Sequence, residues 1–420
     1  MNILVVGSGG REHAICAAFA RSSRVEKIYC ASGNAGISQA AECVPIKPEE
    51  VEKLVEFAAS NSIHLTFVGG ETSLALGIVD EFEKRGLPII GPTKAAACLE
   101  ASKAFSKDFM SRHGLPTAVY RTAYTAADAL TILNDGIFGD EGSAVVVKAD
   151  GLAAGKGVVV AANRQEAADA IDQLKSIAGE EAASRIVLEE CLIGSEVSLL
   201  MFADGEDFAL MPPTRDHKRI RDGDTGPNTG GMGTITDASL LTEEPTREIV
   251  ETIIKPTLKG CKEEGFPFRG ILFLGLMMTA DGPKLLEYNV RFGDPETQSI
   301  LVRLESDFVD ICEAMLAGRL SEIDINWTPG CSATVVLAAK GYPQSPKKGE
   351  VITGLGEVDG VTVFHAGTAR NDAGQIVTSG GRVLGITAVG DDLDVALATC
   401  YREVAKISFE GMQFRRDIGR

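Results

Sequence analysis

The sequence predicts an α/β protein that begins with a doubly wound parallel sheet and ends with a small α/β cap domain. Short apolar runs alternate with helical patterns between residues 2 and 90, as in parallel sheets covered by helices on both faces. Glycine-rich turns follow these runs, at the strand ends where such sheets bind ligands. From residue 326 onwards the pattern changes to short strands separated by glycine-rich turns, which indicates another domain.

Length and charge narrow the classes of function. The 420 residues exceed the size of one hydrophobic core, so we expect several domains. The 59 acidic and 41 basic residues give a net charge of −18. This charge argues against a nucleic-acid partner and against an anionic membrane surface. We expect small-molecule substrates instead.

Neither a membrane span nor a secretion signal is predicted. The first apolar run breaks at Gly7, and the longest apolar run covers only residues 271–278, far short of a span. The nine cysteines are scattered without metal-binding spacing. We therefore expect reduced thiols in a cytoplasmic protein.

The N-terminal unit has predicted strands at residues 2–6, 27–30, 64–68 and 87–90, and predicted helices at 11–21, 48–60 and 74–85. Its first turn, residues 7–10 (GSGG), opens a helix, and helix N-termini bind anions. A dinucleotide site needs a third small residue where the chain has Glu12. It also needs an acidic residue at the end of the second strand, where residues 30–33 read CASG. Arg11 and His13 favour a single phosphate over a purely structural turn.

Residues 101–113 (ASKAFSKDFMSRH) have helical spacing, with Phe105 and Phe109 on one face. Lys103 and Lys107 fall together on the other face. Taken alone, such a lysine pair is typical of a solvent-exposed helix surface.

Residues 145–160 (VVVKADGLAAGKGVVV) predict a hairpin-like pair of strands joined by a glycine-rich loop. Few side chains in the loop are large enough to pack, so we expect it to move. Its backbone N–H groups, together with Lys148 and Lys156, suit polyphosphate. We interpret this stretch as a nucleotide clamp.

Residues 189–196 (EECLIGSE) lie between two predicted strands, at 185–188 and 197–202. The turn is either an adenine hinge or an ordinary hairpin. In a hinge, backbone groups around Cys191 and Leu192 would read the base edge, and Glu196 would accept from ribose hydroxyls. Taken alone, the pattern favours the hairpin.

Residues 216–219 (DHKR) precede a polar, glycine-rich loop at 222–233 for which no secondary structure is predicted. Long loops of this kind are usually functional or disordered. The basic cluster and the free backbone donors favour anion recognition over a flexible connector.

A predicted helix at about 244–264 and a strand at 270–278 lead to KLLEYNVRFGDPE at residues 284–296. Strand alternation places Glu287 and Asn289 on one face. Their oxygens suit Mg²⁺ that is held partly by nucleotide phosphates. Arg291 falls on the same face and could clamp an anion. We favour this metal site over a surface strand edge.

The C-terminal region has predicted strands at 335–339, 361–364, 375–378 and 383–389, and a helix at about 393–407. No polar cluster within it demands chemistry. Its loops at 365–368 and 379–382 could face a site.

In combination, the motifs resemble the phosphoribosylamine–glycine ligase family of the ATP-grasp superfamily over nearly the whole chain. The resemblance rests on GSGGREHA (7–14), GNAG (33–36), SKAFSKDFM (102–110), KADGLAAGKGV (148–158), DHKR (216–219), DTGPNTGGMG (224–233), EYNVRFGDPET (287–297), FHAGT (364–368) and SGGRVL (379–384). Several such motifs in the right order are far more specific than any one of them.

The resemblance implies three domains and one reaction. The domains are a Rossmann-like substrate-binding domain (1–101), an α+β ATP-grasp domain (102–325) with a mobile lid at about 118–190, and a C-terminal cap domain (326–420). The reaction is ATP-dependent ligation of glycine to 5-phosphoribosylamine through glycyl phosphate, a step of purine biosynthesis, with Mg²⁺ or Mn²⁺. Positioning and charge neutralisation carry such phosphoryl transfer, so no enzyme nucleophile is needed. We expect a monomer.

The resemblance also implies a role for individual residues. ATP would be held by Lys103, Lys148, Gly155, Lys156, Gly157, Glu189, Glu190, Cys191, Leu192 and Glu196. Phosphoribosylamine would be held by Gly9, Gly10, Arg11, Glu12, Asn34, Glu71, Asp216 and Lys218. Glycine or its acyl phosphate would be oriented by Arg291, Gly293 and Asp294. The metal would be held by Glu287 and Asn289, and catalysis would depend on Arg291, Lys156 and Asp294.

Two positions depart from the family pattern. Residues 69–71 read Gly-Gly-Glu where the family usually has Gly-Pro-Glu, which keeps the carboxylate but loosens the turn. Gly275 stands where several other ATP-grasp ligases carry a further metal carboxylate, so the protein would contribute few ligands to this metal.

Three alternatives stay open. The first is another ATP-grasp ligase or carboxylase with a different acceptor. The second is an NAD(P)-dependent oxidoreductase, which Glu12 and the missing acidic residue argue against. The third is an ATP-binding regulatory protein without catalysis.

Overall fold

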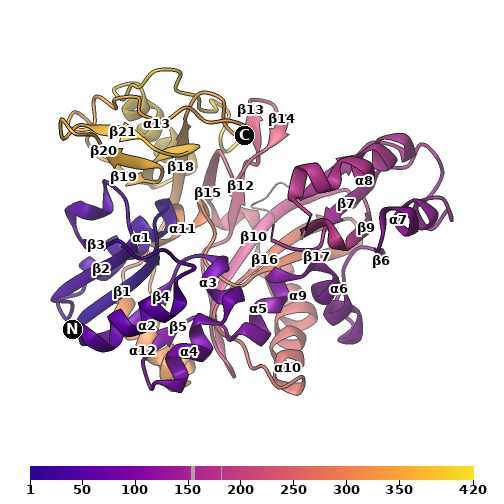
Figure 1. Cartoon of the computed structure of the whole chain (residues 1–420), viewed down its shortest axis with the longest axis horizontal. Coiled ribbons are helices and arrows are strands. Elements are labelled where there is room, and N and C mark those ends of the chain that lie inside the picture. Colours follow the sequence, from indigo (N-terminus) through magenta and orange to yellow (C-terminus); the bar gives the residue numbers. More distant parts are fainter. Residues whose placement is uncertain (153–156, 181) are drawn as a thin grey trace.

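The computed structural model describes residues 1–152, 157–180 and 182–420. Its larger sheets are a parallel sheet near the N-terminus, a four-stranded antiparallel sheet, and a long sheet that runs through the rest of the chain. Figure 1 shows the four-stranded sheet, with helices α7 and α8, projecting to one side of the molecule. None of the described helices is long and apolar enough to cross a membrane.

The N-terminal sheet is parallel and has the strand order β3-β2-β1-β4-β5, which confirms the predicted doubly wound sheet. Its strands are β1 (Asn2–Gly7), β2 (Lys27–Ser32), β3 (Glu42–Val44), β4 (Ile63–Val68) and β5 (Ile89–Ile90). Its helices are α1 (Gly10–Ala20), α2 (Val51–Ser60), α3 (Glu71–Leu76), α4 (Ile78–Lys84) and α5 (Lys94–Ala101). The strand order changes direction at β1, so the loops after β1 and β4 meet at one edge of the sheet. The N–H of Gly69 donates to the carbonyl of Val6 at 2.9 Å there.

The prediction of one continuous helix over residues 74–85 was wrong. Helices α3 and α4 are separate because Gly77 lies between them with a left-handed φ of +88°. Glycine adopts this conformation without the steric cost that a Cβ brings. Helix α3 begins at Glu71, and its first turn lies beside the β1 loop, with Glu71 3.9 Å from Arg11.

The four-stranded sheet has the order β6-β9-β7-β8 and follows helix α6 (Lys103–Arg112). Its elements are β6 (Tyr120–Ala123), α7 (Ala126–Leu133), β7 (Val145–Ala149), β8 (Val158–Ala161), α8 (Arg164–Ala178) and β9 (Ile186–Glu190). Strands β7 and β8 pair antiparallel, with Lys148 opposite Val158, which confirms the predicted hairpin. The sheet and its helices enclose a core of their own around Phe138, Leu174 and Leu188.

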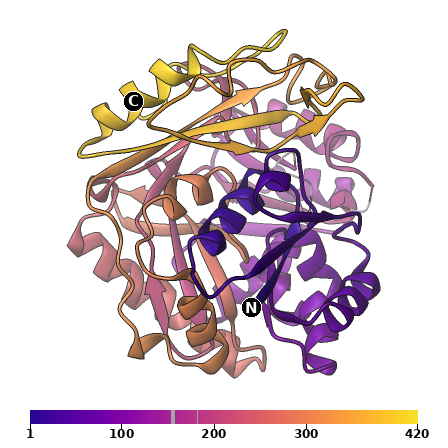
Figure 2. The ribbon, with the colours of Figure 1, turned by 90° about the vertical axis from the view of Figure 1, so that its left-hand side faces the viewer.

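The long sheet has the order β17-β16-β10-β12-β15-β18-β22-β19, with β11 paired to β10. From its central part come β10 (Ser195–Asp204), β11 (Phe208–Leu210), β12 (Thr214–Asp216), β15 (Gly233–Thr236), β16 (Arg269–Thr279) and β17 (Gly282–Asn289). From the C-terminal part come β18 (Cys331–Ala338), β19 (Thr362–His365) and β22 (Arg382–Gly390). The C-terminal strands therefore extend the central sheet, through the pairing of β15 with β18. Figure 2 shows this part lying across the N-terminal and central parts.

The remaining elements cover this sheet or lie at its ends. The helices are α9 (Glu243–Ile249), which continues through a π-helical segment (Val250–Ile254) into α10 (Lys255–Glu263), then α11 (Glu296–Leu301), α12 (Phe308–Ala317) and α13 (Leu393–Val404). The short 3₁₀ turns are Ile37–Gln39, Ala182–Ser184, Ala238–Leu240 and Leu320–Glu322. The two small hairpins are β13 (Arg219–Arg221) with β14 (Thr225–Asn228), and β20 (Thr368–Arg370) with β21 (Ile376–Thr378).

The β13–β14 hairpin corrects the expectation that residues 222–233 have no secondary structure. Thr225 to Asn228 form a strand although the segment is rich in glycine and proline. The strand is held by pairing with β13, and β13 lies outside the stretch on which the expectation was based.

The N-terminal and central parts share their hydrophobic cores. One cluster joins Phe82 of α4 to Phe109 of α6 and Tyr288 of β17. A second joins Phe19 of α1 to Phe308 of α12, whose ring centroids lie 4.7 Å apart. These two parts therefore hold the loops between them in fixed positions, whereas the four-stranded sheet packs on its own core.

Candidate active site

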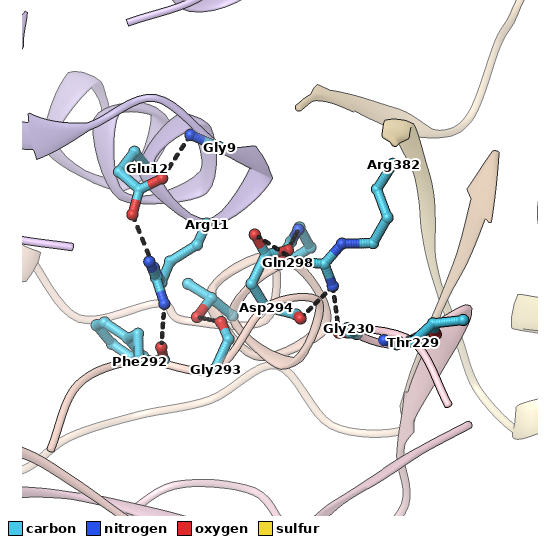
Figure 3. A network of polar contacts seen from close by, with 12 residues as sticks. Gly9, Arg11, Glu12, Thr229, Gly230, Phe292, Gly293, Asp294, Gln298 and Arg382 are labelled. Carbon is cyan, nitrogen blue, oxygen red and sulfur yellow. Dashed lines mark hydrogen bonds and ion pairs between the residues drawn. The ribbon is translucent and has the colours of Figure 1, made fainter. Parts of the chain in front are cut away.

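Loops from three parts of the chain meet at Asp294 (Figure 3). The Gln298 amide donates to Asp294 Oδ1 at 2.8 Å, and the Arg382 guanidinium lies 3.2 Å from Asp294 Oδ2. Arg382 also donates to the carbonyls of Gly230 and Asp294. Burial raises the pKa of Asp294, but the charges of Arg382 and Arg11 outweigh it and lower that pKa below its usual value. Asp294 is therefore an anion held between two guanidinium groups.

Arg382 was not among the predicted site residues. It lies at the start of β22, in the C-terminal part for which no chemistry was expected. The only signal in the sequence was its place in the glycine-rich SGGR loop, which was noted as able to face a site. The distance along the chain between Arg382 and Asp294 explains why local pattern did not join them.

Arg11 and Glu12 form the N-terminal side of this network. The Arg11 guanidinium donates to the carbonyl of Phe292 at 3.0 Å and to Glu12 Oε1 at 2.7 Å. The other oxygen of Glu12 accepts from the N–H of Gly9 at 2.5 Å. Glu12 is only 2% exposed, so it fixes the turn and the Arg11 side chain from inside. The Glu12 side chain packs against Gly69, where a Cβ would lie 2.8 Å from Glu12 Cδ. A dinucleotide site has a small residue at the position of Glu12 and leaves this space open.

Asn34 braces the neighbouring loops. Its Nδ2 group donates to the carbonyls of Ser8 and His365, at 2.8 Å in each case. Its Oδ1 accepts from the N–H groups of Gly36 and Ile37, at 2.9 and 3.0 Å. The amide thus uses both donors and both lone pairs within the protein, and it fixes the position of the β1 loop rather than leaving a group free for a ligand.

Arg291 lies between two carboxylates and one amide. Its guanidinium contacts Glu71 at 3.1 Å, Glu100 at 2.6 Å and Asn289 Oδ1 at 3.0 Å. Burial opposes the ionisation of Glu71, but Arg291 and Arg11 lower the pKa of its carboxyl to about 2. Glu100 was missed by the sequence analysis, because it lies in the last turn of an ordinary helix, α5, and belongs to no motif. Burial raises its pKa, which Arg291 partly offsets.

Glu287 and Asn289 have the surroundings that a divalent cation requires. A bulge in β17 places both Glu287 and Asn289 on the partly exposed face while Leu285 and Tyr288 stay in the core. Among the described residues, no side chain donates a hydrogen bond to the Glu287 carboxylate. Burial opposes its ionisation, but nearby lysines, Lys218 first, lower its pKa below the usual value.

The neighbouring strand makes room for this carboxylate. Gly275 of β16 lies opposite Glu287, and a Cβ there would lie 3.2 Å from Glu287 Cγ. Within the described parts of the chain, no three His, Cys, Asp or Glu residues cluster as metal ligands do. The residues present therefore fit a hard cation that takes most of its ligands from phosphate and water.

Lys148 and Lys103 also lie near Glu287 and help to lower its pKa. Lys148 at the end of β7 lies 2.7 Å from Glu189 Oε1, and Lys107 of α6 lies 2.9 Å from Glu189 Oε2. Lys103 donates to the carbonyl of Gly151 at 3.4 Å. The expectation that Lys107 faces solvent was wrong, since its side chain is 2% exposed and covered by β9. The Glu189 carboxylate faces the two lysines.

The turn after β9 connects directly to β10. Glu190 accepts from the N–H of Val119 at 2.8 Å, and Cys191 and Leu192 are partly buried. Burial raises the pKa of the Cys191 thiol, which disfavours the thiolate. Glu196 pairs with Lys218 at 2.8 Å, which joins a residue assigned to the ATP ribose with one assigned to phosphoribosylamine.

Two further carboxyls lie close to this pair: Asp216 is partly buried and Glu296 is buried. Burial and the charge of Glu296 raise the pKa of Asp216 well above its usual value, and burial raises the pKa of Glu296. Asp216 Oδ1 is buried without a hydrogen-bond partner in the described structure. A Cβ at Gly231 would lie 2.7 Å from that oxygen, so Gly231 leaves space beside it.

The glycines of the site allow close backbone approach. A Cβ at Gly10 would lie 2.5 Å from Gln298 Nε2, and one at Gly9 would lie 3.2 Å from Asp294 Oδ2. A Cβ at Gly293 would collide with Glu296. The carbonyl of Gly157 accepts from the N–H of Ala149 at 2.7 Å. Gly155 and Lys156 lie outside the described residues, so their predicted roles stay predictions.

Comparison with known proteins covers the whole chain. Three family models match: the N domain of phosphoribosylglycinamide synthetase over residues 1–100, its ATP-grasp (A) domain over 101–297 and its C domain over 332–420. Phosphoribosylamine–glycine ligase of Caldanaerobacter subterraneus is 48% identical over 419 residues, which cover 100% of this chain and 99% of that protein. The enzyme of the same name from Pseudomonas aeruginosa is 49% identical over 100% of this chain and 97% of that one.

Solved structures agree with these matches. The crystal structure of phosphoribosylamine–glycine ligase from Thermotoga maritima superposes with a TM-score of 0.84 and 34% identity, and each chain is covered completely. The biotin carboxylase domain of Hydrogenobacter thermophilus 2-oxoglutarate carboxylase, solved with MgADP, superposes with a TM-score of 0.74 over 98% of this chain and 91% of that chain. At 18% identity, this second likeness shows the fold alone. The chain therefore belongs to the phosphoribosylglycinamide synthetase family and has an ATP-grasp fold.

Proposed function

We propose that the chain catalyses ATP-dependent ligation of glycine to 5-phosphoribosylamine, giving glycinamide ribonucleotide, ADP and phosphate, as a step of purine biosynthesis. One observation carries the proposal beyond family membership. The segment from Glu287 to Asp294 has lysines, Lys218, Lys148 and Lys103, near Glu287 at its start, and the guanidinium groups of Arg11 and Arg382 at Phe292 and Asp294. Two anionic substrates can thus be held at the two ends of one segment, as a reaction between ATP and a phosphorylated amine requires.

The lysine side suits ATP. Lys103 and Lys148 would hold its phosphates, with Gly155, Lys156 and Gly157 closing over them. Glu189 to Leu192 would frame the adenine through backbone groups, and Glu196 would accept from the ribose. Glu287 and Asn289 would hold Mg²⁺, or Mn²⁺ in its place. Such an ion, when bound, neutralises phosphate charge.

The chemistry runs in two steps. An oxygen of the glycine carboxylate attacks the γ-phosphorus of ATP, and the bond between that phosphorus and the β-γ bridging oxygen breaks to release ADP. The amine of phosphoribosylamine then attacks the carbonyl carbon of glycyl phosphate, the C–O bond breaks to release phosphate, and the nitrogen loses one proton to the departing phosphate or to solvent. Arg291 and Asp294, beside the Gly293 turn, would orient glycine and its acyl phosphate. The residues contribute position and charge rather than a nucleophile.

The guanidinium side suits phosphoribosylamine. Gly9, Gly10 and Arg11 line the start of α1, where an anion is favoured, and Glu71, Asp216 and Lys218 lie around the same loops. We add Arg382 to this set. Glu12 and Asn34 hold these groups in place from behind. All partners in the proposal are small molecules, and the protein works as a cytoplasmic monomer.

A direct assay tests the proposal. ADP release should require glycine together with freshly formed phosphoribosylamine, and glycinamide ribonucleotide should appear in equal amount. ADP release that ignores glycine but responds to another carboxylic acid would indicate a different ATP-grasp ligase. ATP binding without turnover of any acid would indicate a regulatory protein.

Arg382 provides a sharper test of the substrate assignment. Arg382→Met should raise the KM for phosphoribosylamine by at least about tenfold, because a charge-assisted contact to an anion is lost. The dissociation constant for ATP should stay within a factor of about two, since Arg382 contacts Asp294 and Gly230 rather than the lysines assigned to ATP. Arg370→Met, at an exposed position of β20, is the control. An equal rise in the KM for phosphoribosylamine and in the dissociation constant for ATP would contradict the assignment.

A further inference from the structure

Lys107 is a buried lysine that the proposed reaction does not use. Its ammonium lies 2.9 Å from Glu189 Oε2, and the Lys148 ammonium lies 2.7 Å from Glu189 Oε1. The side chains of Lys107, Glu189 and Lys148 are 2%, 2% and 8% exposed. One carboxylate thus lies between two lysines, and all three groups are almost out of reach of water.

The Lys107 ammonium is fixed on its other side as well. It donates to Thr117 Oγ1 at 2.8 Å, and the Thr117 hydroxyl donates to the carbonyl of Leu285 at 2.6 Å. This chain of contacts joins α6 to β17 through the segment that leads into the four-stranded sheet. Lys107 therefore cannot swing out toward a nucleotide, whereas Lys148 is at the end of its strand, next to the glycine-rich loop.

The charges of the three groups depend on one another. With both lysines protonated, the triad of Lys107, Glu189 and Lys148 carries a net charge of +1. Without the Lys107 charge, Glu189 and Lys148 cancel, and Lys148 is held against β9 by the full charge of the carboxylate. In a buried site this attraction is poorly screened.

We propose that Lys107 is a positioning residue that shares the charge of Glu189 and so keeps Lys148 available to bind nucleotide phosphate. The proposal rests on the function proposed above, in which Lys148 holds the phosphates of ATP. Lys107 itself touches no nucleotide. It acts through Glu189: the charge of Lys107 makes the net charge of the triad +1 instead of zero.

Charge arithmetic gives the decisive experiment, which measures the dissociation constant for ATP. Lys107→Met makes the triad neutral and should weaken ATP binding by at least about tenfold, since one charge beside the phosphates is cancelled. The double variant Lys107→Met/Glu189→Gln restores a net charge of +1, so its ATP affinity should return to within about threefold of the unchanged protein. The control is Lys53→Met/Glu50→Gln, which makes the same change in an exposed ion pair and should leave ATP binding unchanged.

The other outcomes overturn the proposal. If the double variant binds ATP as weakly as Lys107→Met, then Lys107 contacts the nucleotide directly. If Lys107→Met lowers the melting temperature but binds ATP normally, then Lys107 has a purely structural role. Absence of ATP binding by the unchanged protein would instead defeat the proposed function, and the two failures are thereby distinguishable.

A pH series on the unchanged protein decides the question without any variant having to fold. Lys107 is faced by Lys148 of β7, Glu189 of β9 and Glu287 of β17. Burial and the charge of Lys148 lower the pKa of Lys107 to about 8, against the effect of the two carboxylates. ATP affinity should therefore fall as the pH rises through about 8. Constant affinity across that range would overturn the proposal.

Discussion

Arg291 shows how much of the site depends on single ion pairs. Its guanidinium is shared by Glu71, Glu100 and the Asn289 amide. Each of these groups is fixed by a different element, α3, α5 or β17. The orientation of Asn289, and with it the predicted metal site, is therefore coupled to two carboxylates that need not touch any ligand.

Glu71 yields a prediction about acid stability. Its pKa is lowered from 4.5 to about 2 in the fold, so its ionised form stabilises the folded protein. This contribution is complete above pH 4.5 and is lost as the pH falls through about 2. Glu71→Gln should cost up to about 3 kcal/mol at pH 7, because Arg291 and Arg11 lose a partner, and the cost should shrink toward pH 2.

Thermal unfolding of both proteins between pH 7 and pH 2 measures this difference. Glu26→Gln is the control, because the Glu26 side chain is 84% exposed and such pairs contribute little. A gap in melting temperature that persists unchanged at the lowest pH would contradict the assigned role of the Glu71 charge.

Single residues also mark the limit of prediction from sequence. Helical spacing correctly joins Lys103 and Lys107 on one face, but spacing does not say what covers that face, and β9 covers Lys107. Glu12 was recognised as incompatible with a dinucleotide site, yet its part in fixing Gly9 and Arg11 depends on three-dimensional contacts. Arg382 reaches Asp294 only because β22 extends the central sheet.

Among the elements, β17 is the one on which the site most depends. Alternation alone would place Leu285 on the same face as Glu287 and Asn289. The bulge opposite Gly275 and Leu276 shifts the alternation by one residue, so Leu285 packs inside while Glu287 faces the site. The prediction that Glu287 and Asn289 share one face of the strand is therefore confirmed. The bulge that turns Leu285 to the other face could not be predicted.

The segment that follows α13 forms a clamp on the β13–β14 hairpin. Arg415 is 1% exposed and contacts Asp417 twice at 2.8 Å and Asp224 at 2.6 Å. Asp417 also accepts from the N–H of Gly223 at 2.8 Å, and the N–H of Gly419 donates to His217 at 3.0 Å. The DHKR loop and the hairpin are thus held by a segment far along the chain.

Breaking this clamp should destabilise the hairpin. Asp417→Ala leaves the buried Arg415 charge with only an exposed partner and should cost about 3 kcal/mol. Asp224→Ala removes a side chain that is 70% exposed and should cost less than about 1 kcal/mol. Faster tryptic cleavage after Lys218, Arg219 and Arg221 in the first variant, but not in the second, is the expected result. Equal cleavage rates in the two variants would show that the β13–β14 hairpin is stable without the Arg415–Asp417 contact.

Helices and strands were predicted correctly where a single stretch of chain determines the secondary structure. The N-terminal strands, the β7–β8 hairpin and the strand β17 follow from local runs and turns. The split at Gly77 and the hairpin at residues 219–228 were missed, because each depends on backbone conformation or on pairing with a segment outside the pattern. The domain limits at 101 and 325 stay predictions.

At the scale of the whole molecule, the hydrophobic cores distinguish two kinds of part. The sheet of β6 to β9 has its own core. The C-terminal part, by contrast, supplies β18 to pair with β15, and Ile235 of β15 packs in the C-terminal core. The sheet of β6 to β9 should therefore be removable without unfolding the rest of the protein, whereas the C-terminal part should not be.

Two shortened chains test this difference. A chain ending at residue 325 exposes the edge of β15 and the apolar partners of Ile235, so it should bind a hydrophobic dye and aggregate. A chain in which residues 120–189 are replaced by a short glycine-serine linker should stay folded, because Glu190 N–H and the Val119 carbonyl lie 2.9 Å apart and are easily joined. Circular dichroism and size-exclusion chromatography give the result, and two aggregated chains would contradict it.

The buried Glu12 has an evolutionary consequence. Glycine at residue 69 is required only while Glu12 occupies the space beside it, because Gly69 itself lacks a left-handed φ. The two positions should therefore be epistatic: Gly69→Ala should be harmful alone and tolerated together with Glu12→Ala, as double-variant melting temperatures would show. A lineage can therefore replace Gly69 only after Glu12 has been replaced, and this order of changes isolates the turn from the dinucleotide-binding turns that it outwardly resembles.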